Sequence, residues 1–148
     1  MKFTVVVLSA LLVSALANPI TFKDCGSTGA TVHSVDVGGC TTEPCHLVHG
    51  KNATMIVNYT ASEDVTHPTN DISGIIAGIP IKFPTNPDCC ASKNLVCPVK
   101  SGTSSQYTIA IYVNPTYPKI SVLVKLAVLD DNKKDFLCLV FPAIITDS

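Results

Sequence analysis

Seven cysteines and four histidines are the side chains of this 148-residue chain that could bind a metal, attack a substrate or cross-link the backbone. A structural zinc site needs paired cysteines or histidines at short, regular spacing. The chain has no repeated Cys-x-x-Cys, and none of its histidines stands at ligand spacing from paired cysteines: His33, His46, His49 and His67. We therefore expect no metal site and no cofactor.

Catalytic motifs are also missing from the sequence. Ser, His and Asp are present, but the chain has no nucleophile elbow and no paired-carboxylate motif. All ten basic residues are lysines and the net charge is −1. Bidentate guanidinium contacts to bases or phosphates are therefore absent. We expect neither an enzyme nor a nucleic-acid-binding protein.

The N-terminal residues have the pattern of a secretory signal peptide. Lys2 provides a positive start, an apolar run extends from Phe3 to Val13, and Ala15-Leu16-Ala17 is a small-x-small cleavage site. We expect a signal peptide over residues 1–17 and one secreted domain over residues 18–148. No later segment reaches the roughly 18 apolar residues that a membrane-spanning helix needs.

Secretion makes disulfide formation the expected use of the cysteines. With seven cysteines one is left over, and counting alone does not choose among the pairings of the other six. The spacing suggests the following closures: Cys40 with Cys45, Cys97 with Cys90 or Cys89, and Cys25 with Cys138. The vicinal pair Cys89-Cys90 is not expected to bond to itself, because the small ring strains the peptide.

The elements that position these residues are predicted to be strands. Short runs rich in Val, Ile, Thr and Tyr alternate with turn signals such as Gly38-Gly39, Asn86-Pro87 and Asn114-Pro115. This pattern is typical of an all-β sandwich or barrel. No long stretch combines a helical period with capping residues.

Glycosylation sequons at Asn52 and Asn58 orient one strand. A glycan on Asn58 must face solvent, so its neighbours Val57 and Tyr59 face inward, because strand residues alternate between faces. Polar residues orient two further runs in the same way, and their inward-facing residues include Ile109, Ile111, Val113, Val122 and Val124. Such apolar faces fit a filled core or a lipid cavity, and alternation does not distinguish the two.

A set of short segments extends over essentially the whole mature chain. They are Phe22-Lys23-Asp24-Cys25-Gly26-Ser27, Pro44-Cys45-His46-Leu47, Gly78-Ile79-Pro80-Ile81-Lys82-Phe83-Pro84, Cys97-Pro98-Val99, Tyr117-Pro118-Lys119-Ile120 and Phe136-Leu137-Cys138. No single segment is decisive, but the ordered set with its cysteines is highly specific. In this set the chain resembles the Niemann-Pick type C2 family, the MD-2-related lipid-recognition (ML) proteins.

The resemblance implies an all-β fold, an immunoglobulin-like β-sandwich of two antiparallel sheets with an apolar cavity between them. It implies three disulfides, which are Cys25–Cys138, Cys40–Cys45 and Cys90–Cys97. Cys89 is then unpaired. Because no histidine or aspartate can be placed beside it as a general base, we expect a buried or capped thiol rather than a nucleophile.

The resemblance also implies a noncovalent carrier of cholesterol or a related sterol. Phe83, Val113 and Tyr117 match the positions that shape the cavity mouth in sterol-carrying members, and the inward residues named above would line the cavity. The chain differs from the vertebrate sterol carriers in two features that bear on ligand choice. Lys82 stands where they have an uncharged residue beside the mouth, and the segment from Phe83 to Cys90 is shorter than theirs.

Alternative functions stay open at this point. The chain could carry fatty acids or other hydrophobic signals, or recognise microbial lipid in innate immunity. For the sterol carrier we expect a secreted monomer, with the endosomal or lysosomal lumen as the alternative destination. Its expected partner is a membrane sterol transporter or an acidic membrane surface.

Overall fold

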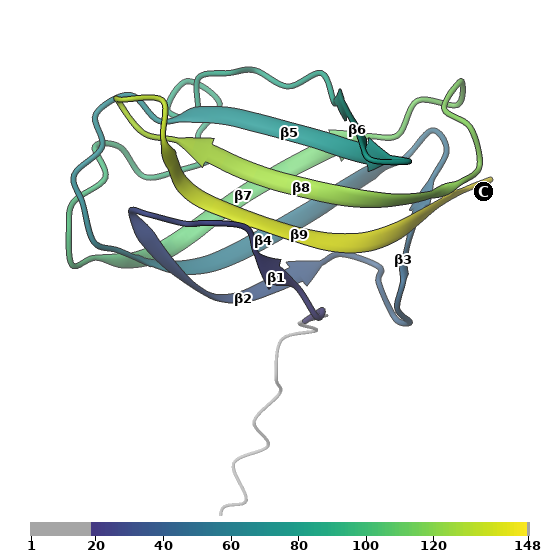
Figure 1. The fold of residues 1–148 in the computed structure, drawn as a ribbon, viewed down its shortest axis with the longest axis horizontal. Coiled ribbons are helices and arrows are strands. Elements are labelled where there is room, and N and C mark those ends of the chain that lie inside the picture. The colour runs from purple at the N-terminus through teal and green to yellow at the C-terminus, as the bar shows by residue number, and fades with distance from the viewer. Residues whose placement is uncertain (1–18, 148) are drawn as a thin grey trace, which may run out of the picture.

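The computed structural model describes residues 19–147, in which nine strands and no helix form two sheets packed face to face (Figure 1). The predicted signal peptide over residues 1–17 lies outside the described residues. Within residues 19–147 no helix is long and apolar enough to cross a membrane.

The larger sheet has the strand order β1-β9-β8-β5-β6, with β3 added alongside β9. Its strands are β1 (Lys23–Asp24), β3 (Cys45–Val48), β5 (Thr69–Ile76), β6 (Ile79–Lys82), β8 (Ser121–Leu129) and β9 (Asp135–Thr146). The smaller sheet has the order β2-β4-β7. It consists of β2 (Ala30–Val37), β4 (Asn52–Ala61) and β7 (Ser104–Tyr112).

One strand pair differs from the prediction of purely antiparallel sheets. β3 runs parallel to β9, with Cys45 opposite Ala143 and Val48 opposite Thr146. After β2 the chain leaves the smaller sheet and crosses to the larger one, so β3 meets β9 without a local hairpin that would impose an antiparallel direction. The other pairings between strands are antiparallel, as expected.

Alternation along β4 is the feature that the sequence predicted most directly. Val57 and Tyr59 are buried, while Asn58 and Thr60 between and beyond them are only half-buried. β7 and β8 likewise bury every second residue, and β8 adds Ala127 to that set. The predicted inward orientation is confirmed for these three strands, because one apolar face per strand is removed from water.

The interior between the sheets is filled by branched and aromatic side chains. Val57, Tyr59, Ile109, Ile111, Val113 and Val124 are each at most 4% exposed. The ring of Tyr59 meets that of Phe136 edge to face, with centroids 5.8 Å apart. The interior along these strands is therefore occupied by side chains.

Three disulfides cross-link the chain. They are Cys25–Cys138, Cys40–Cys45 and Cys90–Cys97, which are the pairings that the resemblance implied. The spacing left open whether Cys97 pairs with Cys89 or with Cys90, and in the structure it pairs with Cys90. Cys89 is a buried free thiol.

The disulfides should differ in their effect on stability, because they close loops of very different length. Cys25–Cys138 spans 113 residues and Cys40–Cys45 spans 5. Chain-entropy estimates give about 5 kcal/mol for the long loop and about 2 kcal/mol for the short one. We expect chemical denaturation to show a larger loss for C25S/C138S than for C40S/C45S. Equal losses would contradict this account.

Candidate apolar ligand pocket

An apolar pocket of about 110 Å³ opens where β6 meets the 113–120 loop, which connects β7 to β8. Both lie at the same end of the sandwich as the C-terminus (Figure 1). The pocket is lined by Gly74, Ile76, Ile81, Lys82, Phe83, Tyr117, Pro118, Val122 and Ile145. Lys82 is the one charged residue in this lining, and its ammonium lies 3.6 Å from Asp71 on the neighbouring strand.

The β5–β6 hairpin brings Phe83 to the pocket. Its turn residues Ala77 and Gly78 have φ angles of 50° and 81°, the positive values that a tight hairpin turn requires. Directly after β6, the Phe83 amide donates to the carbonyl of Ile72 at 2.9 Å. The Phe83 ring is 9% exposed and meets the ring of Tyr117 at 5.9 Å. The two aromatic rings thus pack edge to face and both line the pocket.

Gly74 makes room for this arrangement. A Cβ at position 74 would lie 2.9 Å from Val122 Cγ2 and 3.3 Å from two atoms of the Phe83 ring. Both distances are too short for ordinary packing, so any side chain here would displace Phe83 or Val122. A glycine inside a strand often marks such a close approach.

The structure brings together three of the nine residues predicted to contact lipid. Phe83, Tyr117 and Val122 line the pocket. The other six are buried elsewhere in the interior, without lining it: Val57, Tyr59, Ile109, Ile111, Val113 and Val124. They belong with Phe83 to one continuous cluster of buried side chains.

Several lining residues were missed at the level of sequence. Ile81 lies two residues before Phe83, so strand alternation could have placed it on the same side. Gly74 could have been found as a glycine within a strand pattern. Ile145 carries no such signal, because its place depends on how the 113–120 loop and the end of β9 meet.

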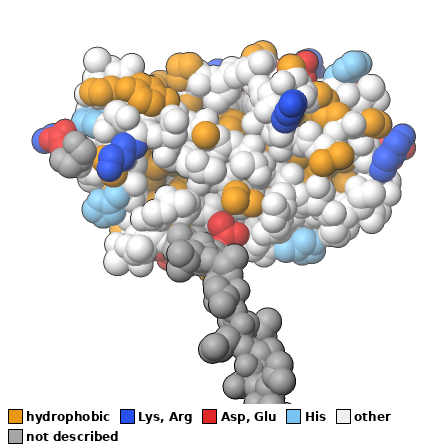
Figure 2. Space-filling model, turned by 180° about the vertical axis from the view of Figure 1, so that it is seen from behind, with side chains coloured by type: hydrophobic (Ala, Val, Ile, Leu, Met, Phe, Trp, Pro, Cys, Tyr) orange, Lys and Arg blue, Asp and Glu red, His pale blue; other side chains and the backbone are white. Residues whose placement is uncertain are grey.

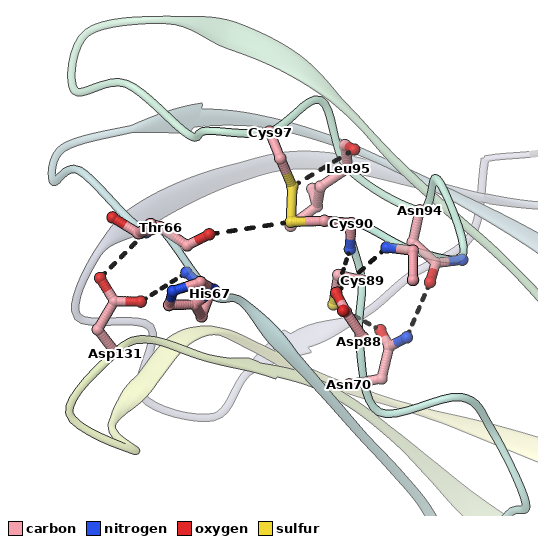
Figure 3. The surroundings of a disulfide bond; sticks show 11 residues. Thr66, His67, Asn70, Asp88, Cys89, Cys90, Asn94, Leu95, Cys97 and Asp131 are labelled. Carbon is pink, nitrogen blue, oxygen red and sulfur yellow. Dashed lines mark hydrogen bonds between the residues drawn. A yellow bond between two sulfur atoms is a disulfide. The ribbon is translucent and has the colours of Figure 1, made fainter.

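Cys89 occupies a different environment and does not line the pocket. Its Sγ donates to Asn70 Oδ1 at 3.1 Å, and the Tyr107 hydroxyl donates to the same oxygen. Asn70 Nδ2 in turn donates to the Asn86 carbonyl at 2.9 Å and to Asn94 Oδ1 at 2.8 Å. Figure 3 shows Cys89 beside Asn70, while its neighbour Cys90 forms the disulfide. The network anchors the 86–94 segment to the sandwich.

The electrostatics of Cys89 match a structural role. Burial, followed by the nearby Asp88 charge, raises the pKa of the thiol to about 12. Burial also raises the pKa of Tyr107, which keeps its hydroxyl protonated as a donor. A thiol that stays protonated is a poor nucleophile. Among residues 19–147, no group of three or more His, Cys, Asp or Glu side chains is placed to hold a metal ion.

We expect iodoacetamide to leave Cys89 unmodified in the folded protein at pH 8, because the thiol is buried and protonated. Adding denaturant should expose it and allow one alkylation per chain under non-reducing conditions. Mass spectrometry reads both states. Alkylation of the native protein at the rate of a free thiol would contradict the structure.

Comparison with known proteins places this fold and pocket in a family. The sequence profile of the ML domain matches residues 19–145. The ecdysteroid-regulated 16 kDa protein of Manduca sexta is 37% identical over 141 residues, which cover 93% of this chain and 95% of that protein. NPC intracellular cholesterol transporter 2 of Danio rerio is 35% identical over 142 residues, which cover 96% and 95%.

A solved structure shares the same architecture. The Niemann-Pick type C2 protein from the Japanese carpenter ant superposes with a TM-score of 0.78, over 86% of this chain and 100% of that chain. The two are 23% identical, so this likeness concerns the fold alone. With the profile match over residues 19–145 and relatives above 30% identity along nearly their full length, the chain belongs to the ML domain family.

Proposed function

We propose that this protein binds cholesterol or a related sterol noncovalently between its two sheets and carries it through aqueous surroundings. The observation that carries the proposal is the apolar pocket at one end of the sandwich. Its lining residues Phe83, Val122 and Ile145 belong to the cluster of buried side chains that fills the interior. Similarity to a protein named as a cholesterol transporter supports a sterol as the ligand.

A sterol needs more room than the pocket now offers. Sites for ligands of this size measure roughly 300–1,000 Å³, whereas this pocket measures about 110 Å³. Binding therefore requires the Phe83 ring to swing away and the inward side chains of the two sheets to separate. None of the three disulfides joins β4 or β7 to the larger sheet, so the covalent framework permits that separation.

The driving force is the removal of apolar surface from water. Each 100 Å² of buried apolar surface contributes about 2.5 kcal/mol. The immobilisation of the ligand and the separation of the sheets oppose that gain. Tyr117 and Lys82 are the lining residues with polar ends at the mouth, so the sterol hydroxyl would face them. No covalent step is required.

The surface around the pocket suits transfer to a membrane. Ile79 and Ile81 on β6 are 64% and 54% exposed. Figure 2 shows apolar side chains gathered at the end of the molecule that carries β6 and the 113–120 loop. For transfer we propose that this end faces an acidic membrane surface or a membrane sterol transporter, with Lys82 supplying positive charge. The protein would act as a monomer, secreted or in the endosomal or lysosomal lumen.

Glycans at the two predicted sites would leave the mouth free. Asn52 and Asn58 both lie on β4, in the smaller sheet, which contributes no residue to the pocket lining. Asn58 Nδ2 donates to Ser34 Oγ at 2.8 Å, and its Oδ1 accepts from Gln106 at 3.0 Å. The outer face of this sheet, seen in Figure 2, consists mainly of uncharged groups.

A fatty-acid carrier is the second candidate function, and Lys82 is the observation that favours it. An ammonium in the pocket lining would pair with a carboxylate head group, which a sterol lacks. The ion pair between Lys82 and Asp71 is 3.6 Å long, and the Lys82 side chain is 82% exposed, so a ligand carboxylate could replace Asp71 as its partner.

Titration of a fluorescent sterol into the purified protein separates these functions. We expect saturable binding that unlabelled cholesterol displaces and that oleate and lipid A do not. Tight oleate binding without sterol binding would move the function to the fatty-acid carrier. Tight lipid A binding would move it to lipid recognition. Either result would contradict the sterol proposal.

Phe83→Ala tests the mouth directly. Loss of one wall of the pocket should weaken sterol binding by about tenfold or more, equivalent to roughly 1.4 kcal/mol. The matched control is Tyr112→Ala, because Tyr112 is 53% exposed and outside the pocket lining. Circular dichroism checks that both variants fold. Equal sterol affinity in the two folded variants would remove Phe83 from the binding site.

A further inference from the structure

His49 is a largely buried histidine at the edge of the pocket that the proposed function does not use. It directly follows β3, and its side chain is 12% exposed. Nδ1 lies 2.8 Å from Asp147 Oδ1, and Nε2 lies 2.8 Å from the carbonyl oxygen of Tyr117. The imidazole thus bridges the C-terminal end of β9 and the 113–120 loop.

Both partners of the ring only accept hydrogen bonds. A carboxylate and a backbone carbonyl have no proton to donate. A neutral imidazole carries a proton on one nitrogen, whereas an imidazolium carries protons on both. The two contacts of His49 can therefore be hydrogen bonds at the same time only when the ring is doubly protonated.

The contact with Tyr117 holds the middle of a loop whose ends are fixed independently. Gly50 N donates to the Val113 carbonyl at 2.7 Å, and Ile145 N donates to the Ile120 carbonyl at 3.0 Å. Between these ends, two polar contacts reach the loop from elsewhere in residues 19–147. The His49 ring contacts the Tyr117 carbonyl oxygen, and the Lys119 ammonium donates to Asp147. Both converge on the same His49–Asp147 pair.

We propose that His49 is a positioning residue for the pocket mouth: doubly protonated, it holds Tyr117 in place, and on losing a proton it lets the 113–120 loop move. The consequence for ligand exchange rests on the proposed function, because the Tyr117 ring lines the pocket and packs against Phe83. The effect of His49 protonation on the loop itself does not depend on the proposed function.

The charged groups that face His49 keep their charges in mild acid. Hydrogen bonds from Lys119 and then His49 lower the pKa of Asp147, so it remains a carboxylate in mild acid. The hydrogen bond to Asp147 raises the pKa of Lys119, which remains charged. Lys51, in the same turn as His49, and the Tyr117 phenol complete the set of nearby titratable groups. Histidine changes charge between about pH 5 and 8.

The direction of the effect follows from the strengths of the two acceptors. A carboxylate is the stronger acceptor, so a singly protonated ring keeps its proton on Nδ1. Nε2 then presents a lone pair to the Tyr117 carbonyl, and that hydrogen bond is lost. The loop is therefore held at acidic pH and released as the pH rises through the histidine range. Sterol dissociation should accelerate about fivefold from pH 5 to pH 7.5, the effect of one hydrogen bond.

NMR of the ligand-free protein tests the loop without any lipid. We expect the backbone amides of Thr116, Tyr117 and Lys119 to shift with the same midpoint as the His49 imidazole signals. His49→Gln, which does not titrate, should abolish the shift. His46→Gln, which changes an exposed histidine on β3 itself, should leave it unchanged. If the loop amide shifts of the unmodified protein do not follow the imidazole signals, the proposal is overturned. This outcome does not depend on whether His49→Gln folds.

Dissociation of the fluorescent sterol between pH 5 and 7.5 tests the consequence for exchange. We expect the pH dependence to vanish in His49→Gln and to persist in His46→Gln. The same slope in His49→Gln as in the unmodified protein would overturn the role of His49 in exchange. If the loop follows the imidazole but no sterol binds, the positioning role stands and the sterol proposal fails.

Discussion

The removal of two apolar strand faces from water is the constraint on which the rest of this structure depends. Because strand side chains alternate, each of β4, β7 and β8 must bury every second residue against the opposite sheet. The disulfides leave that contact free of cross-links between β4 or β7 and the larger sheet. The same apolar contact that stabilises the fold is therefore the one that a lipid would have to replace.

The pocket arises where that contact ends. β5 turns back through Ala77 and Gly78 to form β6, and the chain then places Phe83 over the missing side chain of Gly74. The 113–120 loop supplies the facing wall through Tyr117.

Much of the fold was predictable, because its signals are local. Asn58 fixes the faces of one strand, and Val57 and Tyr59 follow by alternation. Which of Cys89 and Cys90 pairs with Cys97 depends on backbone geometry, so spacing left it open, and only the family resemblance implied Cys90. The parallel β3–β9 pairing and the His49 bridge join residues about 100 positions apart. The local sequence around β3, β9 and His49 does not predict such long-range contacts.

We infer that a bound sterol lies between the sheets rather than on the surface of the mouth. Intermolecular NOEs between bound sterol and methyl-labelled protein test it most directly. The account predicts contacts to the methyl groups of Ile109, Ile111 and Val124, which are now buried in the interior. Contacts confined to Ile81 and the outer rim, with the interior methyl signals unchanged, would contradict it.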